Sequence, residues 1–295
     1  WNLQGSTSDC ELKYDLYDNL RDATTVSFSA DQATAGSADG TYSYTLTNLI
    51  PEETYYLSMR TVCADKVSEW SEVASGTVGK PVVKIGDVDV DKPMVALTFD
   101  GGPDGDGVTD RILTVLSDNQ GKATFFQTGV NAAAYPDLMK RMVEEGHEIG
   151  NHTYDESTSG EDVTENDIVA ANDAIEAACG VRPVLFRAPQ GDVTDNIIEI
   201  CQQEGMSIII FNFDSHDWEY YDAEEIIDRI ETYVEDGDII QFRNVYEETA
   251  SAIETLVPYL IEEGYQLVTV SEMIQARTGE LPAVGTIYYS GSDHE

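Results

Sequence analysis

The sequence predicts an α/β protein: a distorted barrel of about seven parallel strands, preceded by a small all-β sandwich. Two observations support this prediction. From residue 93 onward, short apolar segments alternate with helical patterns, as in parallel sheets whose strands are joined by helices. Before residue 79, short alternating segments are separated by clusters of Gly, Asn and Asp. The predicted parts are a sandwich at 1–78, truncated at its start, a linker at 79–92, the barrel at 93–280 and a C-terminal tail at 281–295.

Four strands are predicted in the first part from their alternation of apolar and polar residues: Glu11–Tyr17, Thr24–Phe28, Tyr42–Leu46 and Tyr55–Thr61. The segment Leu49–Tyr55, followed by Glu69–Ser71, resembles the second half of a fibronectin type III module, with Tyr55 as the tyrosine-corner residue. The resemblance implies that Cys10 and Cys63 lie on antiparallel neighbouring strands, where a bridge is geometrically reasonable. It also implies a module that spaces or docks other domains, and hence a protein partner.

The second part contains seven predicted strands, each placed before a helical pattern. The strands are Val95–Phe99, Ala123–Gln127, Glu148–Gly150, Val184–Arg187, Ser207–Phe213, Asp238–Phe242 and Gln266–Val270. The helices between them are Asp110–Ser117, Pro136–Glu145, Thr164–Ala178, Thr194–Glu204, Ala223–Val234 and Thr249–Glu263. Thr164 and Thr194 stand where a capping side chain begins a helix.

Acidic residues dominate the composition, with 56 Asp and Glu against 16 Lys and Arg and a net charge of −40. Such a surface repels nucleic acids and anionic bilayers, so neither is expected as a partner, whereas neutral or cationic ligands, glycans included, remain open. The alternative is that the acidity only keeps the protein soluble. The longest apolar stretch, Ser207–Phe211, is too short to span a membrane, so membrane insertion is not expected.

The four cysteines form no CxxC pair, and two fall in each predicted part. An even number favours two structural disulfides in an exported protein. Cys10 and Cys63 fall in the first part and Cys179 and Cys201 in the second, which allows one disulfide in each part and leaves the connectivity open.

Chemically active side chains follow several of the predicted barrel strands. These positions are Asp100, the segment Asn151–Glu156, the segment Arg187–Gly191, the segment Asp214–Trp218 and the pair Arg243–Asn244. Because parallel strands present their carboxyl ends at one rim, these acids, histidine, arginines and tryptophan are expected to converge there. The sequence therefore predicts a functional rim.

The motifs in this set resemble those of the NodB-homology polysaccharide deacetylases, carbohydrate esterase family four. The matching pieces, in chain order, are Thr98–Pro103, Gly146–Thr153, Phe186–Gly191, Asp214–Trp218, Gly237–Asn244 and Gly264–Met273. The resemblance implies removal of acetyl groups from N-acetylated sugars by one divalent metal ion, held by an Asp and two His. It also implies a separate Asp base and a His acid.

Carried over position by position, the resemblance implies catalytic roles for Asp100 as base, for Arg187 and Asp217 as residues that orient it, and for Asp214 as the residue that tunes the acid. His152 falls at the first histidine ligand and Glu156 at the second. The substrate pocket is expected to include Pro189, the backbone N–H of Gln190, the wall residue Trp218, and Gln241 in place of a leucine.

Three positions depart from the family pattern. Gly101 stands at the metal-binding Asp and has no ligating atom, Glu156 replaces a histidine, and Arg243 replaces the acid histidine. Arginine does not deprotonate under working conditions, so it cannot serve as the acid. We hypothesise that Arg243 reaches Glu156, or Asp100 and Asp214, and supplies the positive charge that a metal would bring. No cofactor is expected.

The resemblance implies a protein directed at N-acetylated glycans such as peptidoglycan or chitin-like polymers, and we expect it to be extracellular or cell-surface, of the bacterial secreted type. The three departures predict that its catalysis is impaired or absent. One alternative is an active N- or O-deacetylase that holds zinc, cobalt or nickel at a rearranged site, using carboxylates such as Asp104, Asp106 or Asp155. A second alternative is an interaction scaffold that acts through the fibronectin-like module.

Overall fold

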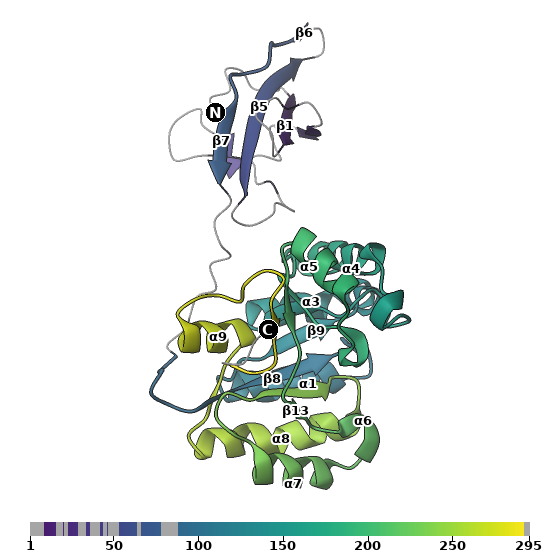
Figure 1. The fold of residues 1–295 in the computed structure, drawn as a ribbon, viewed down its shortest axis with the longest axis vertical. Helices are drawn as coiled ribbons and strands as arrows, with labels where there is room; N and C mark the ends of the chain where they lie inside the picture. The colour runs from purple at the N-terminus through teal and green to yellow at the C-terminus, as the bar shows by residue number, and fades with distance from the viewer. Residues whose placement is uncertain are drawn as a thin grey trace. The chain divides into compact units, whose positions relative to one another are not determined.

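The computed structural model describes residues 9–15, 20, 23–28, 34–35, 42–43, 46, 53–63, 66–77 and 88–291. The chain divides into two compact units, Trp1–Val82 and Val83–Glu295 (Figure 1).

The N-terminal unit is antiparallel in its described part. Its strands are β1 Asp9–Asp15, β2 Thr24–Phe28, β3 Thr34–Ala35, β4 Tyr42–Ser43, β5 Thr54–Cys63, β6 Lys66–Val67 and β7 Ala74–Thr77. Five of them form a sheet in the order β2-β1-β5-β6, with β7 also on β5, and β3 pairs with β4. The expected neighbours β1 and β5 pair with Cys10 opposite Thr61. A second packed layer is not evident among these strands, so the fibronectin-like sandwich remains a prediction, and Leu49–Pro51 lie outside the described residues.

The larger unit contains a parallel sheet in the order β13-β14-β8-β9-β10-β11-β12-β16, with β15 on the start of β8. The strands are β8 Met94–Asp100, β9 Thr124–Gln127, β10 Glu148–Asn151, β11 Leu185–Phe186, β12 Ser207–Ile209, β13 Phe213–Asp214, β14 Ile239–Arg243, β15 Gln266–Leu267 and β16 Ile287–Tyr288. Every predicted strand of this unit is present. The sheet curls but does not close, because β13 and β16 are its two edges.

Helices connect these strands. They are α1 Val108–Asp118, α2 Gly129–Ala134, α3 Pro136–Glu144, α4 Glu165–Cys179, α5 Asp195–Gln203, α6 Asp217–Tyr220, α7 Ala223–Tyr233, α8 Glu247–Glu262 and α9 Val270–Thr278, with 3₁₀ turns at Gly160–Asp162 and Pro189–Gly191. Both expected caps are confirmed: Thr194 accepts from the backbone of Ile197, and Thr164 forms a capping box with Asp167. Helices α7 and α8 pack together (Figure 1). Helices α2 and α3 pack against α4.

Side chains alternate along β8, so one face of the strand packs in the apolar core and the other leads to the candidate site. Val95, Leu97 and Phe99 point to one face, where Phe99 stacks with Phe125 of β9 at 5.0 Å and with Phe242 of β14 at 5.6 Å between ring centroids. The intervening residues of β8 point to the other face, inside the curl of the sheet. Asp100, the last of these, therefore lies at the carboxyl end of a fully buried strand.

Two predicted features differ in the structure. The predicted strand Ser207–Phe213 is divided into β12 and β13, because the Asn212 side chain bonds to Asp238 and to the backbone of Ile239 instead of continuing the ladder. The predicted tail contains β16, which pairs in parallel with β12 and buries Tyr288.

The predicted Cys179–Cys201 disulfide is wrong, because both thiols are free. Cys179 ends α4 and donates to the carbonyl of Ile175 at 3.2 Å, whereas Cys201 is buried in a separate apolar cluster under α5. The Cys63 side chain lies outside the described part of the chain, so the Cys10–Cys63 bridge stays a prediction. No helix in the described residues is both long and apolar enough to cross a bilayer.

Candidate functional site

Asp100 lies at the centre of the rim and is 3% exposed. Its Oδ1 accepts from the Arg187 guanidinium at 2.9 Å, and its Oδ2 accepts from the Gln241 amide at 3.2 Å. Three strands thus meet at this carboxylate, since Arg187 follows β11 and Gln241 belongs to β14.

Arg187 is fully buried behind Asp100. Its guanidinium donates to Thr98 and to the carbonyls of Ile209 and Ile210, and it stacks over the Phe126 ring at 4.1 Å. A buried arginine with this many acceptors holds the adjacent carboxylate in one orientation. The predicted contact between Arg187 and Asp100 is therefore present.

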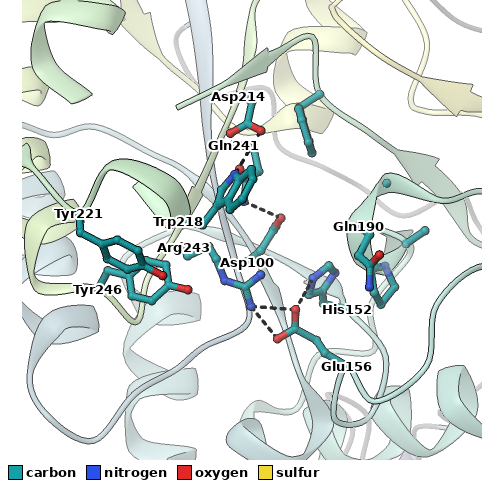
Figure 2. A pocket seen from close by; sticks show the side chains of 14 residues that line it. Asp100, His152, Glu156, Gln190, Asp214, Trp218, Tyr221, Gln241, Arg243 and Tyr246 are labelled. Atoms are coloured by element: carbon teal, nitrogen blue, oxygen red, sulfur yellow. Dashed lines mark hydrogen bonds and ion pairs between the residues drawn. The ribbon is translucent and has the colours of Figure 1, made fainter. Parts of the chain in front are cut away.

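The hypothesis that Arg243 reaches Glu156 is confirmed. One guanidinium nitrogen of Arg243 lies 2.8 Å from each oxygen of the Glu156 carboxylate, and His152 Nε2 lies 3.1 Å from Glu156 Oε1 (Figure 2). His152 is held from behind, because its Nδ1 lies 2.8 Å from the carbonyl of Arg187. These side chains form a chain of contacts across the pocket floor.

The charges of this floor shift the pKa values of its groups. Burial alone would raise the pKa of Glu156, but the hydrogen bond with His152 and the charge of Arg243 lower it to about 2. Burial would lower the pKa of His152, yet the charge of Asp100 and the contact with Glu156 raise it above its ordinary value. Both shifts favour the ionised pair.

The missing side chain at Gly101 makes room for this arrangement. A Cβ on Gly101, whose φ is +86°, would lie 2.7 Å from the Arg243 guanidinium and 3.0 Å from Glu156 Oε2. The guanidinium therefore occupies the space into which a ligating side chain at position 101 would project.

A divalent metal ion does not fit these residues. Catalytic zinc sites use about three protein ligands, and here His152 and Glu156 supply two, while Gly101 supplies none. Glu156 already binds a guanidinium, and a second cation would have to share its oxygens. The carboxylate of Asp104 accepts backbone N–H groups at the start of α1, and that of Asp155 accepts the backbone N–H of Ser157. Among the described residues no cluster of three or more His, Cys, Asp and Glu could hold a metal.

Asp217 lies beneath the rim and is fully buried. Its Oδ2 accepts from the Arg243 backbone N–H and the Thr249 hydroxyl, both at 2.6 Å, whereas its Oδ1 has no hydrogen-bond partner among the described residues. Burial raises the pKa of Asp217 to about 6. These two hydrogen bonds join the end of β14 to α8, so Asp217 fixes the backbone of Arg243 rather than the side chain of Asp100.

The segment after β13 forms the next part of the rim. Asp214 accepts from the backbone of His216 at 2.8 Å and from the Trp218 indole at 3.3 Å. The His216 ring stacks on Trp218 and on Tyr220, with centroids 5.9 and 5.6 Å apart. Trp218 itself is 46% exposed, so its ring is open to a ligand.

These elements enclose a pocket of about 610 Å³ (Figure 2). It is lined by Asp100, His152, Glu156, Ala188, Pro189, Gln190, Gly191, Phe211, Asp214, Trp218, Tyr221, Gln241, Arg243 and Tyr246. Every predicted site residue lines it except Arg187 and Asp217, which support the lining from behind. Phe211, Tyr221 and Tyr246 were not predicted from the sequence. Tyr221 could have been noticed three residues after Trp218, but Phe211 and Tyr246 have no motif signal.

Opposite Tyr221 and Tyr246, the turn Pro189–Gly191 forms the other wall (Figure 2). Gln190 has a left-handed backbone, with φ of +61°, which is uncommon for a residue with a side chain. Strained backbone of this kind is concentrated at functional sites. The role of the Gln190 N–H toward an oxyanion remains a prediction.

Comparison with known proteins agrees with this geometry. A family model described as "Polysaccharide deacetylase" matches residues 87–209. The peptidoglycan-N-acetylmuramic acid deacetylase PdaC of Bacillus subtilis (strain 168) is 34% identical over 193 residues, which cover 64% of this chain and 40% of that protein. A peptidoglycan-N-acetylglucosamine deacetylase of Bacillus cereus is 33% identical over 190 residues, covering 62% of this chain and 88% of that protein. The solved structure of a family 4 acetyl xylan esterase from Clostridium thermocellum, in complex with a cobalt ion, matches with a TM-score of 0.60 and 28% identity, covering 67% of this chain and 98% of that one.

The curled parallel sheet, with its pocket at the carboxyl ends of the strands, defines an α/β protein with the fold of the carbohydrate esterases of family four. The chain belongs to the polysaccharide deacetylase family, the NodB-homology carbohydrate esterases of family four. It spans less than half the length of PdaC.

Proposed function

We propose that this chain is a glycan-binding member of the polysaccharide deacetylase family in which the metal-dependent reaction has been lost. The observation that supports this most directly is the contact of Arg243 with both oxygens of Glu156, next to Gly101. The Arg243 guanidinium thus stands where the family's reaction needs a metal ion.

Two parts of the family's reaction have no group to perform them. Without a metal ion, neither the acetyl carbonyl nor a water molecule is polarised. Arg243, at the position of the acid, keeps its proton, so it cannot protonate a departing amine. Together these losses remove several kcal/mol of transition-state stabilisation. Asp100 remains an acceptor without an activated water to deprotonate.

The pocket nevertheless keeps the features of a ligand site. It is concave, has aromatic walls and retains Asp100, Arg187, Asp214 and Trp218 of the family's motifs. Two of the relatives named above are peptidoglycan deacetylases, and this supports a ligand among glycans of the bacterial cell wall or related amino-sugar polymers. We propose that the protein acts outside the cell. A protein partner bound through the N-terminal unit is a separate prediction.

Two measurements test the proposal. One is titration of the purified chain with zinc, cobalt and nickel, and the other is an acetate-release assay on N-acetylchitohexaose and peptidoglycan fragments. We expect no stoichiometric metal binding at micromolar affinity and no acetate above background. Stoichiometric metal with acetate release would instead establish a deacetylase with a rearranged site.

The variant that combines Gly101→Asp, Glu156→His and Arg243→His provides the matched control, because it supplies the ligands and the acid that the family pattern contains. We expect it to bind metal in the same titration. If the variant binds metal and the natural chain does not, these three positions account for the loss of metal binding. If neither protein binds metal, the three positions do not explain the loss.

A further inference from the structure

The charges that line the pocket are unbalanced. Three carboxylates, those of Asp100, Glu156 and Asp214, face two basic groups, the Arg243 guanidinium and the His152 imidazole. Both basic groups are bound to Glu156, the guanidinium at 2.8 Å and the imidazole at 3.1 Å. Asp100 and Asp214 therefore have to be balanced by other groups.

Asp100 is balanced on one side only. Arg187 contacts its Oδ1 from the buried face, while its Oδ2 has only the neutral amide of Gln241, at 3.2 Å. Asp214 accepts from a backbone N–H and from the Trp218 indole. Its Oδ2 lies 3.8 Å from the His216 imidazole, and no Lys or Arg in the described part of the chain forms an ion pair with its side chain. The pocket thus presents two carboxylates to which neither of its basic side chains, Arg243 and His152, is hydrogen-bonded.

Aromatic rings stand beside these carboxylates. Trp218 and Tyr221 are 46% and 56% exposed, and Tyr221 packs edge-on against Tyr246, with centroids 5.4 Å apart (Figure 2). The C–H face of a sugar ring packs on such rings, and their π faces also attract a cation. Carboxylates and open aromatic faces in one pocket complement a ligand that is both a sugar and a cation.

We propose that the pocket binds glycans whose amino groups are free, that is, 2-amino-2-deoxy sugars that have already lost their acetyl groups. This inference rests on the proposed function and names its ligand. A protonated amine offers charge and three N–H donors to Asp100 and Asp214, whereas an acetamide offers one N–H and a carbonyl. The net charge of −40 attracts the same polycationic glycans at longer range.

The inference is tested by calorimetric titration of the full chain with chitohexaose, whose amino groups are free, and with N-acetylchitohexaose, whose amino groups are acetylated. Both titrations are made at low salt and about pH 6, where amines are protonated and carboxylates ionised. We expect chitohexaose to bind at least about tenfold more tightly. Asp214→Asn should weaken chitohexaose binding about fivefold or more. The control Glu262→Gln, which removes the same charge from the exposed end of α8, should leave it unchanged.

Titration with hexalysine, a cation without sugar rings, separates recognition of the sugar from attraction of positive charge alone. Tyr221→Ala, at a position whose side chain is 56% exposed, should weaken chitohexaose binding much more than hexalysine binding. Equal affinities for hexalysine and chitohexaose, or equal effects of Asp214→Asn and Glu262→Gln, would overturn the inference.

The two proposals fail differently. Tighter binding of the acetylated oligomer without acetate release would overturn the preference for amino sugars and leave the non-catalytic function standing. Acetate release would overturn the non-catalytic function, and the absence of binding by either oligomer would overturn both.

Discussion

Gly101 and Arg243 are coupled through space. Because a Cβ at position 101 would lie 2.7 Å from the guanidinium, Gly101→Ala should displace Arg243 from Glu156 in addition to straining a backbone with φ of +86°. Gly180, with φ of +78° and open space where a Cβ would lie, isolates the backbone cost, which is about 1 kcal/mol.

Urea unfolding should therefore show a larger loss of stability for Gly101→Ala than for Gly180→Ala, by about 1–2 kcal/mol. In an Arg243→Ala background the extra loss should vanish, because the contact is already absent. Equal losses in the natural background would contradict the coupling.

Asp217 should destabilise the fold at neutral pH. Its pKa in the folded protein, about 6, lies above the ordinary 3.8, so the folded state binds the proton more tightly than the unfolded state does. Protonation therefore stabilises the folded state at low pH, and this stabilisation is lost as pH rises from about 4 to about 6. Asp217→Asn keeps an oxygen for Arg243 and Thr249 without the charge. We expect it to raise the free energy of unfolding at pH 7 by about 1–3 kcal/mol.

The difference between Asp217→Asn and the natural chain should shrink toward zero as pH falls to about 4, where Asp217 is protonated in the folded protein. Asp217→Ala serves as the control, because it loses both hydrogen bonds and should be less stable than the Asn variant. An advantage of Asn that persists unchanged at low pH would show that charge is not the cause.

Motif residues could be placed from the sequence because each follows a strand, and strand ends converge at one rim. Asp100, His152, Arg187 and Trp218 were all found in this way. Phe211 and Tyr246 could not be, since their positions in the pocket depend on the break after β12 and on the path that follows β14. Tertiary geometry of this kind leaves no periodic signal in the chain.

At the scale of elements, the alternation of strands and helices was sufficient to predict the sheet but not its edges. The run Ser207–Phe213 looks like one strand because apolar residues dominate it, and the contacts of Asn212 with Asp238 and Ile239 divide it. The short helix α6 and the two-residue strand β16 are too brief for a sequence pattern to reveal.

Strand β16 should contribute to the stability of the larger unit. Tyr288 is 5% exposed, packs against the cluster that contains Met94 and Ile239, and accepts a hydrogen bond from the Ala283 backbone. Tyr288→Ala should lower the free energy of unfolding by about 3 kcal/mol or more, through the lost packing.

Tyr288→Phe keeps the ring and removes only the hydroxyl, so it should cost about 1 kcal/mol. Urea unfolding monitored by circular dichroism measures both variants. Losses below about 0.5 kcal/mol for the alanine variant would mean that this segment behaves as the predicted tail.

At the scale of the whole molecule, the excess of 56 acidic over 16 basic residues sets two responses to salt that run in opposite directions. Self-repulsion of like charges destabilises the folded chain, and salt screens it, so the melting temperature should rise as sodium chloride increases from about 20 mM to about 500 mM. The attraction of a cationic glycan is screened by the same ions, so the affinity for chitohexaose should fall over the same range.

Measuring both quantities in one salt series separates the surface from the pocket. If only the net negative charge of the protein surface attracts the ligand, its affinity should approach zero at high salt. Contacts with the partly buried Asp214 and the aromatic wall should instead leave a residual affinity, which Tyr221→Ala removes. A melting temperature that falls with salt would contradict the role assigned to self-repulsion. Binding that disappears entirely, in the natural chain as in the Tyr221 variant, would assign the interaction to net charge rather than to the pocket.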